Sequence, residues 1–295
     1  MEDIKRTTLT PKEELDIVEL ARTERRKLDL GMGPLGEKIF AVLRDNNIQL
    51  LYFTLEPKDS KGLAAFYLKK YSSVTGIHSY YIAINTSIPL DLQIFNACHE
   101  YYHHIDEIDD SLHLRRMGEP DDELIDAKAN RFAAEFLLPT ESLTTYVKKH
   151  NRGEVFLKNW SKNAILRLIA QIQIDYQVPY RMIVKRLYEV DSINSIEKED
   201  LLAIDERNEN SVYYKIGKTM NDYIFKKLNT ATLKSGVDSE ALNVILQNYD
   251  EGIITVDTTV KDLKLFSKTL EDFGYSIDIL EEDIDELNDL FEDDK

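Results

Sequence analysis

The sequence predicts an α+β fold, because β-strand patterns occupy one early stretch of the chain and helical patterns occupy most of the rest. Three short segments rich in aromatic and β-branched residues are separated by turn residues, which predicts a small antiparallel sheet. These segments are residues 48–55, 63–71 and 79–85. From residue 87 onward, apolar residues recur at helical spacing, so we expect helical regions to follow the sheet.

Two helices are expected before the sheet. Thr10-Pro11-Lys12-Glu13 combines a capping box with proline at the first helical position, which is typical of a helix start. This helix should end near Leu30, before Gly31-Met32-Gly33-Pro34. A second helix over residues 35–44 leads into the first strand.

The first helix after the sheet is expected over residues 87–105. Ile94, Cys98, Tyr101 and Ile105 lie at i, i+4, i+7 and i+11, which gives one apolar stripe. Cys98 belongs to that stripe, so we expect a small buried apolar side chain rather than a metal-binding thiolate. A polar stretch separates this helix from the next one, expected over residues 124–138 and closed by a proline.

The chain length of 295 residues suits two compact units and a tail. We expect the sheet and its helices to form one domain. The predicted regions are a domain over 1–150, a helix-turn-helix-like segment packed on it over 151–192, a linker over 193–211, a small helical domain over 212–274 and an acidic amphipathic tail over 275–295.

Charge is distributed unevenly along the chain. The formal net charge of −17 argues against a protein that coats nucleic acid with its whole surface, but residues 271–295 alone carry a net −11. Residues 145–188 carry a net +7, so this segment is expected to support the main domain, with nucleic-acid contact as the alternative. Apolar residues at helical spacing in the tail suggest that it docks on a partner or on residues 145–188.

The composition also limits the cellular setting. A single cysteine excludes an intramolecular disulfide, and the first residues lack the apolar core of a secretory signal. No apolar run approaches the ~18 residues of a membrane span. We therefore expect a cytoplasmic protein with no membrane association.

The strongest chemical signal is His99-Glu100-Tyr101-Tyr102-His103. Two histidines four residues apart on a helix project from one face, where both can bind one Zn²⁺ ion, and the glutamate between them can contact a water molecule at the metal. Four acids in the region of the next helix are candidates for a third ligand, namely Asp121, Asp122, Glu123 and Asp126. Asp126 is favoured because Asn130, four residues later, shares its helical face and can accept a hydrogen bond from a ligating histidine.

Three blocks of sequence together resemble the ImmA/IrrE family of metallo-endopeptidases. They are Asn85-Thr86-Ser87-Ile88-Pro89, the histidine motif with the preceding Ala97-Cys98, and Ala129-Asn130-Arg131-Phe132-Ala133-Ala134 continued by Glu135-Phe136-Leu137-Leu138-Pro139. The resemblance covers about residues 10–145 and implies a zincin-like, gluzincin-type zinc endopeptidase. It places the third ligand at Asp126, where the family usually has glutamate.

The resemblance also implies a function and a mechanism. The expected substrate is a helix-turn-helix repressor or another regulatory protein, in a phage, mobile-element, defence or stress system. Glu100 is expected to act as general base on the water at the zinc. A substrate peptide is expected to pair with the strand carrying Tyr81, Ala83 and Asn85. Candidates for the oxyanion donor remain open, namely Tyr67, Tyr71, Tyr80, His104 and His113.

The alternative to an enzyme is a regulatory or antitoxin-like binding module that keeps the zincin fold and cleaves nothing. An intact Glu100 favours the enzyme, because a module that only binds its partner does not need a general base.

Overall fold

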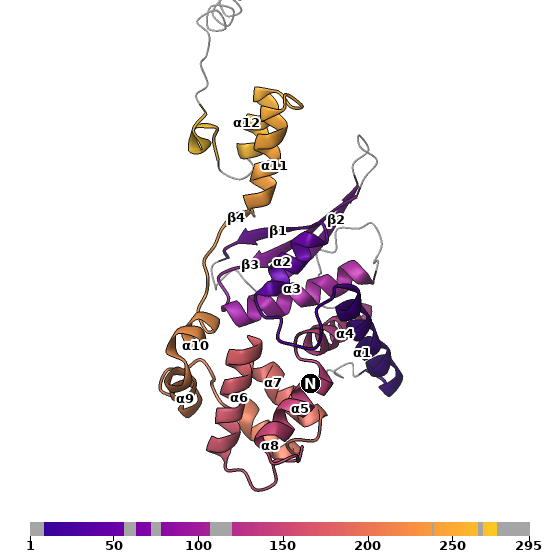
Figure 1. Ribbon diagram of the computed structural model, residues 1–295, viewed down its shortest axis with the longest axis vertical. Helices are drawn as coiled ribbons and strands as arrows, with labels where there is room; N and C mark the ends of the chain where they lie inside the picture. The colour runs from indigo at the N-terminus through magenta and orange to yellow at the C-terminus, as the bar shows by residue number, and fades with distance from the viewer. Residues whose placement is uncertain are drawn as a thin grey trace, which may run out of the picture. The chain divides into compact units, whose positions relative to one another are not determined.

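The computed structural model describes residues 9–55, 63–71, 78–106, 120–237, 239–264 and 268–275. The chain divides into two compact units, Met1–Ser235 and Gly236–Lys295. The first unit contains the sheet and the helices around it (Figure 1). The α+β class expected from the sequence is therefore confirmed.

Three strands form the sheet of the first unit, in the order β2-β3-β1. They are β1 (Ile48–Phe53), β2 (Ala65–Tyr71) and β3 (His78–Asn85). The expected antiparallel arrangement is correct for β2 and β3 but wrong for β1 and β3, which are parallel. Strand β3 lies between β1 and β2 and is parallel to one and antiparallel to the other, so the sheet is mixed.

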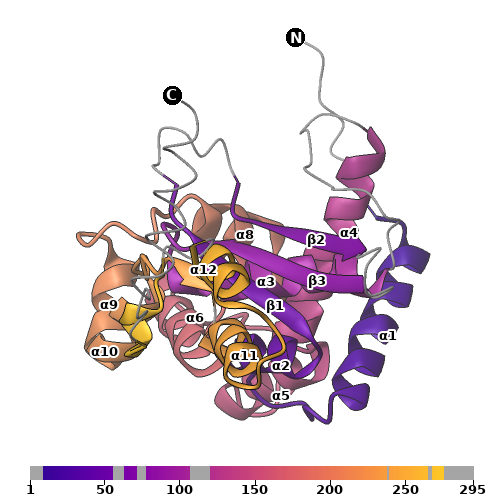
Figure 2. The same cartoon turned by 90° about the horizontal axis from the view of Figure 1, so that it is seen from above.

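Helix α3 (Leu90–Ile105) packs against β2, β3 and α4 (Pro120–Leu137). It runs beneath the sheet in Figure 1, and Figure 2 shows the strands crossing above it. Of the predicted apolar stripe, Ile94, Cys98 and Tyr101 are buried and Ile105 is half-buried, and Cys98 is fully enclosed. Burial also raises the pKa of the Cys98 thiol, which agrees with its assignment as a small apolar side chain.

Helices α1 (Pro11–Lys27) and α2 (Lys38–Asp45) precede the sheet. The predicted capping box is present, because Thr10 and Glu13 exchange hydrogen bonds. Near the end of α1, the buried guanidinium of Arg25 donates to the carbonyls of Gly31, Gly33 and Phe136. One charged side chain thus holds the loop after α1 against the C-terminal turn of α4.

The described part of the first unit contains six further helices. They are α5 (Thr140–His150), α6 (Lys162–Tyr176), α7 (Tyr180–Glu189), α8 (Ser195–Leu202), α9 (Val212–Met220) and α10 (Asp222–Leu228). The expected linker over 193–211 contains α8, with Ile193 and Leu201 buried. Two of its polar residues, Asn194 and Glu197, form the capping box at the start of α8.

The second unit is smaller than the expected domain over 212–274. Helices α9 and α10 pack with α6 in the first unit, and the second unit begins at Gly236 with the short strand β4 (Gly236–Val237). It contains α11 (Ser239–Asp250), α12 (Val256–Lys264) and the 3₁₀ turn Glu271–Phe273 around a small core. That core consists of Leu246, Leu263 and Leu270.

Residues 276–295, which hold most of the predicted tail, lie outside the described residues. Among the helices that the structure describes, none combines the length and the apolar character that a membrane crossing needs.

A close helix contact gives the first testable expectation. A Cβ atom added at Gly217 in α9 would lie 2.0 Å from the buried ring of Phe225. We expect Gly217→Ala to destabilise the protein by about 1–2 kcal/mol, because overpacking outweighs the gain in helix propensity. Gly33→Ala is the control, since a Cβ atom there meets nothing within 4 Å. Equal urea-unfolding midpoints for the two variants would contradict the close contact.

Candidate metal centre

The structure brings His99, His103 and Asp126 together. Both histidines lie on α3 and are buried, and Asp126 faces them from α4. One ligand atom from each residue lies within 4.8 Å of the others, and His99 Nε2 is 3.5 Å from Asp126 Oδ1. Among the described residues, these three form a group that could hold a metal ion.

The spacing of these atoms fits Zn²⁺. Two ligands at ~2.0–2.2 Å from a tetrahedral centre are separated from each other by about 3.4 Å. The distance between His99 Nε2 and Asp126 Oδ1 is close to that value. Two imidazoles and one carboxylate also match a catalytic zinc site, which uses three protein ligands and keeps one position open.

Asn130 orients one of the histidines. Its Oδ1 lies 3.0 Å from His99 Nδ1, so the contact expected from the spacing of Asp126 and Asn130 is present. A proton on Nδ1 donates to the amide oxygen and leaves Nε2, the atom that faces Asp126, free of a proton. Helix α4 therefore supplies both the acid and the group that fixes the histidine tautomer.

Glu100 follows His99 directly on α3 and is also buried, with 7% of its surface exposed. Its position beside the two histidines suits a general base at the metal. Glu123, a rival for the third ligand, is exposed on α4 and does not belong to the described metal group. The side chains of Asp121 and Asp122 lie outside the part that the structure describes.

The prediction that a substrate peptide pairs with the strand carrying Tyr81, Ala83 and Asn85 is wrong. Tyr81, Ala83 and Asn85 lie on β3, where they face Gln49, Leu51 and Phe53 of β1 across the parallel pairing. On its other side, β3 pairs with β2. Both edges of β3 are occupied, so a substrate peptide cannot add to it. The edge strand next to β3 is β2.

The proposed oxyanion donors are placed differently from one another. Tyr67 on β2 is buried, with its hydroxyl 3.2 Å from His104 Nδ1, and the Tyr80 ring packs against His104. Burial, with a smaller effect of Tyr80, raises the pKa of Tyr67 to about 12, so its hydroxyl keeps its proton at neutral pH. Tyr71 is 56% exposed at the end of β2, and His113 lies outside the described residues.

The start of α3 contains an ion pair that the sequence does not predict. Asp91 is fully buried, and Arg207 donates to both of its carboxylate oxygens at 2.8 and 3.1 Å. Gln173 donates to Asp91 Oδ2 and accepts a hydrogen bond from the Tyr213 hydroxyl. An acid in the first helical turn is common, but its partner lies 116 residues away, which no local pattern reveals.

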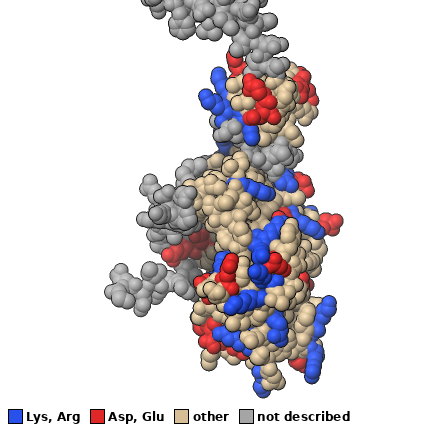
Figure 3. Space-filling model, turned by 90° about the vertical axis from the view of Figure 1, so that its left-hand side faces the viewer, with Lys and Arg blue, Asp and Glu red and all other residues tan. Residues whose placement is uncertain are grey.

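The Lys and Arg side chains of the basic segment, residues 145–188, lie in two different environments. Arg186 is buried and paired with Glu135 at 2.8 Å, so it cannot contact an external partner. The other Lys and Arg residues of the segment are exposed. Figure 3 shows one face of the molecule, where Lys and Arg are interspersed with Asp and Glu. Nucleic-acid contact through 145–188 stays a prediction.

Together, the mixed sheet, the helix with two buried histidines and the facing aspartate define a zincin-like domain of the metallopeptidase class. Residues 44–188 match the family model of the M78 peptidases, described as the IrrE N-terminal-like domain. The domain over these residues belongs to this family, which agrees with the ImmA/IrrE resemblance of its motifs. No curated protein matches the chain.

Proposed function

We propose that the protein is a zinc-dependent endopeptidase that makes limited cleavages in a regulatory protein. The observation that carries this proposal is the convergence of His99, His103 and Asp126, with Glu100 next to the first histidine. The family match supports a metallopeptidase activity. The single cysteine, buried at position 98, is compatible with the reducing cytoplasm that we propose as its location.

The roles of the residues follow from their placement. A zinc ion bound by His99, His103 and Asp126 would supply a water molecule of lowered pKa and polarise the scissile carbonyl. Glu100 would take a proton from the attacking water and later give it to the leaving amine. Asn130 would hold His99 in the tautomer that leaves Nε2 for the metal.

The substrate would pair with β2 (Ala65–Tyr71). This strand is at the edge of the sheet and packs against α3, which carries the two histidines. Its outer backbone groups can accept an added strand, whereas those of β3 are used by β1 and β2. An extended segment of the substrate would therefore lie along β2, close to α3.

A helix-turn-helix repressor of a phage, mobile-element, defence or stress system is the proposed substrate. This choice rests on the resemblance to ImmA/IrrE endopeptidases. The test is to incubate the zinc-loaded protein with the helix-turn-helix regulators encoded beside its gene and to sequence the N-termini of the products. One or two defined new N-termini support the proposal, whereas intact regulators in every case contradict this substrate class.

The metal centre has a direct test. We expect Asp126→Ala to weaken zinc binding by more than the roughly 100-fold that loss of an outer-shell partner costs, and to lose peptidase activity, because only two protein ligands would remain. The measurement is zinc affinity by competition with a chromophoric chelator, combined with peptide hydrolysis.

Glu123→Ala is the matched control for this test, because Glu123 lies on the same helix but outside the described metal group. It should keep both zinc and activity. If Glu123→Ala loses zinc and Asp126→Ala retains it, the third ligand is Glu123 and not Asp126.

A further inference from the structure

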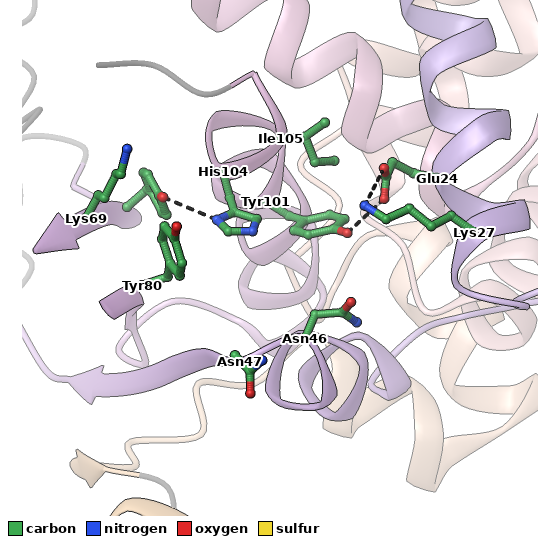
Figure 4. Close-up of a pocket in the computed structure, with 10 residues that line it drawn as sticks. Glu24, Lys27, Asn46, Asn47, Lys69, Tyr80, Tyr101, His104 and Ile105 are labelled. Atoms are coloured by element: carbon green, nitrogen blue, oxygen red, sulfur yellow. Dashed lines mark hydrogen bonds and ion pairs between the residues drawn. The ribbon is translucent and has the colours of Figure 1, made fainter. Parts of the chain in front are cut away.

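One face of the sheet packs against α3, and β2 contributes a tyrosine and a lysine to the middle of that face. Tyr67 lies there, because its hydroxyl is 3.2 Å from His104 Nδ1 on α3. Lys69 is two residues further along β2 and shares the face, since side chains alternate along a strand. It lines the space that Tyr80 and His104 share with the last turns of α3 (Figure 4). A peptide added beside β2 would thus meet polar groups on this face.

The opposite face of the sheet, here called the outer face, is apolar beside β2. Phe66 and Leu68 of β2 point to it, because they alternate with Tyr67. Phe66 lies beside Ala83 of β3, which in turn lies beside Leu51 of β1. The rings of Phe66 and Phe53 are 5.9 Å apart between centroids. Phe66, Leu68 and Leu51 are half-buried, and none of the three belongs to the hydrophobic cores that the described residues form.

A strand added to the edge of β2 would continue this alternation. Neighbouring strands lie about 4.8 Å apart, and side chains directly opposite each other point to the same face of the sheet. Two side chains of the added strand, two residues apart, would therefore lie beside Phe66 and Leu68 on the outer face. The next residue of β2 on this face is Lys70, which is exposed. The apolar strip at this edge is thus long enough for two such side chains.

From these features, we propose that the outer face selects the substrate. The protein binds an extended segment that carries large apolar side chains at two alternate positions, next to Phe66 and Leu68. This inference rests on the proposed function, which makes β2 the substrate strand, and it adds the kind of segment that is recognised. Phe66 and Leu68 would then determine specificity from the face of β2 that points away from α3 and its histidines.

The test is the affinity of two labelled peptides for the full-length, zinc-loaded Glu100→Gln protein, in which a bound peptide should stay intact. Both are threonine peptides of the length of β2 with two leucines, at alternate positions in one and at adjacent positions in the other. Adjacent leucines point to opposite faces, so only one of them can reach the outer face. We expect the peptide with alternate leucines to bind about three-fold more tightly, because it gains one more apolar cross-strand pair.

Phe66→Thr and Leu68→Thr should each remove this preference, because threonine suits a strand but offers little apolar surface. Leu51→Thr is the matched control, since Leu51 is also half-buried on the outer face but lies on β1, with β3 between it and β2. It should keep the three-fold preference. Leu68→Lys tests the same position by charge, and it should bind a peptide with one leucine changed to glutamate more tightly than the peptide with two leucines.

The inference is overturned if the two peptides bind equally, if neither binds, or if Leu51→Thr removes the preference as Leu68→Thr does. Because the readout is binding, it is independent of hydrolysis. The expected preference in a protein that shows no Glu100-dependent cleavage would contradict the proposed peptidase and support the binding surface. Glu100-dependent cleavage without the preference would contradict this inference alone.

Discussion

Replacing Glu100 by glutamine is expected to lower kcat for peptide hydrolysis about a hundred- to ten-thousand-fold, which is the usual contribution of a general base. Glutamine keeps the shape of this buried side chain but cannot take a proton from water. Zinc should stay bound, because the metal group consists of His99, His103 and Asp126. The measurement is kcat for a cleaved peptide together with the zinc content of the variant.

Glu199→Gln makes the same chemical change at a side chain that is 70% exposed on α8. It should leave both zinc and kcat unchanged. If Glu100→Gln cleaves as fast as the unaltered protein, Glu100 is not the base. If the protein binds zinc but cleaves no partner in a Glu100-dependent way, the binding module becomes the better description.

Replacing Arg186 by methionine is expected to lower the free energy of unfolding by about 3 kcal/mol, because the change leaves a buried carboxylate without its main partner. Arg186 and Glu135 are each 1% exposed and lie 2.8 Å apart. Arg186 also donates to the Leu138 carbonyl and to the Thr140 hydroxyl. The measurement is urea unfolding at neutral pH.

Arg181→Met is the matched control, since Arg181 lies on the same helix in an ion pair with Glu206 but is 57% exposed. We expect a change of about 0.5 kcal/mol or less. A similar loss of stability in both variants would show that burial of the Arg186 pair has no special effect.

The effect of Arg186→Met should also depend on pH. Burial alone would raise the pKa of Glu135, but the charge of Arg186 and the hydrogen bonds from Thr140 bring it below the ordinary value of 4.5. The unaltered protein gains this stability above the unfolded pKa and loses it as the pH falls through the folded pKa. Without Arg186, burial should raise the pKa of Glu135, so the difference between the two proteins should shrink in acid.

Local patterns in the sequence predicted the elements that make up the candidate site. The spacing of His99 and His103 places both on one helical face whatever the rest of the fold does. The spacing of Asp126 and Asn130 likewise predicted the contact with His99, which is present at 3.0 Å. The capping box of Thr10 and Glu13 can likewise be predicted from the sequence, because all of its atoms lie within one helical turn.

Features that depend on distant parts of the chain could not be predicted in this way. The alternation of residues in β1, β2 and β3 indicates strands but not which strand lies in the middle, so it does not reveal which strand has an open edge for a substrate. The polar stretch over 193–211 has the composition of a linker, yet Leu201 is buried and Arg207 pairs with Asp91.

The bonds at the start of α3 bear on how much of the chain is needed to build the metal centre. The family match ends at residue 188, but Arg207, Thr230 and Thr232 form hydrogen bonds with the first turns of α3, at Asp91, Leu90 and Gln93. At the other end of this helix, Glu24 accepts the Tyr101 hydroxyl, and residue 24 precedes the matched region. A piece that keeps all of these bonds to α3 must therefore extend from α1 to Thr232, well beyond both ends of the homologous domain.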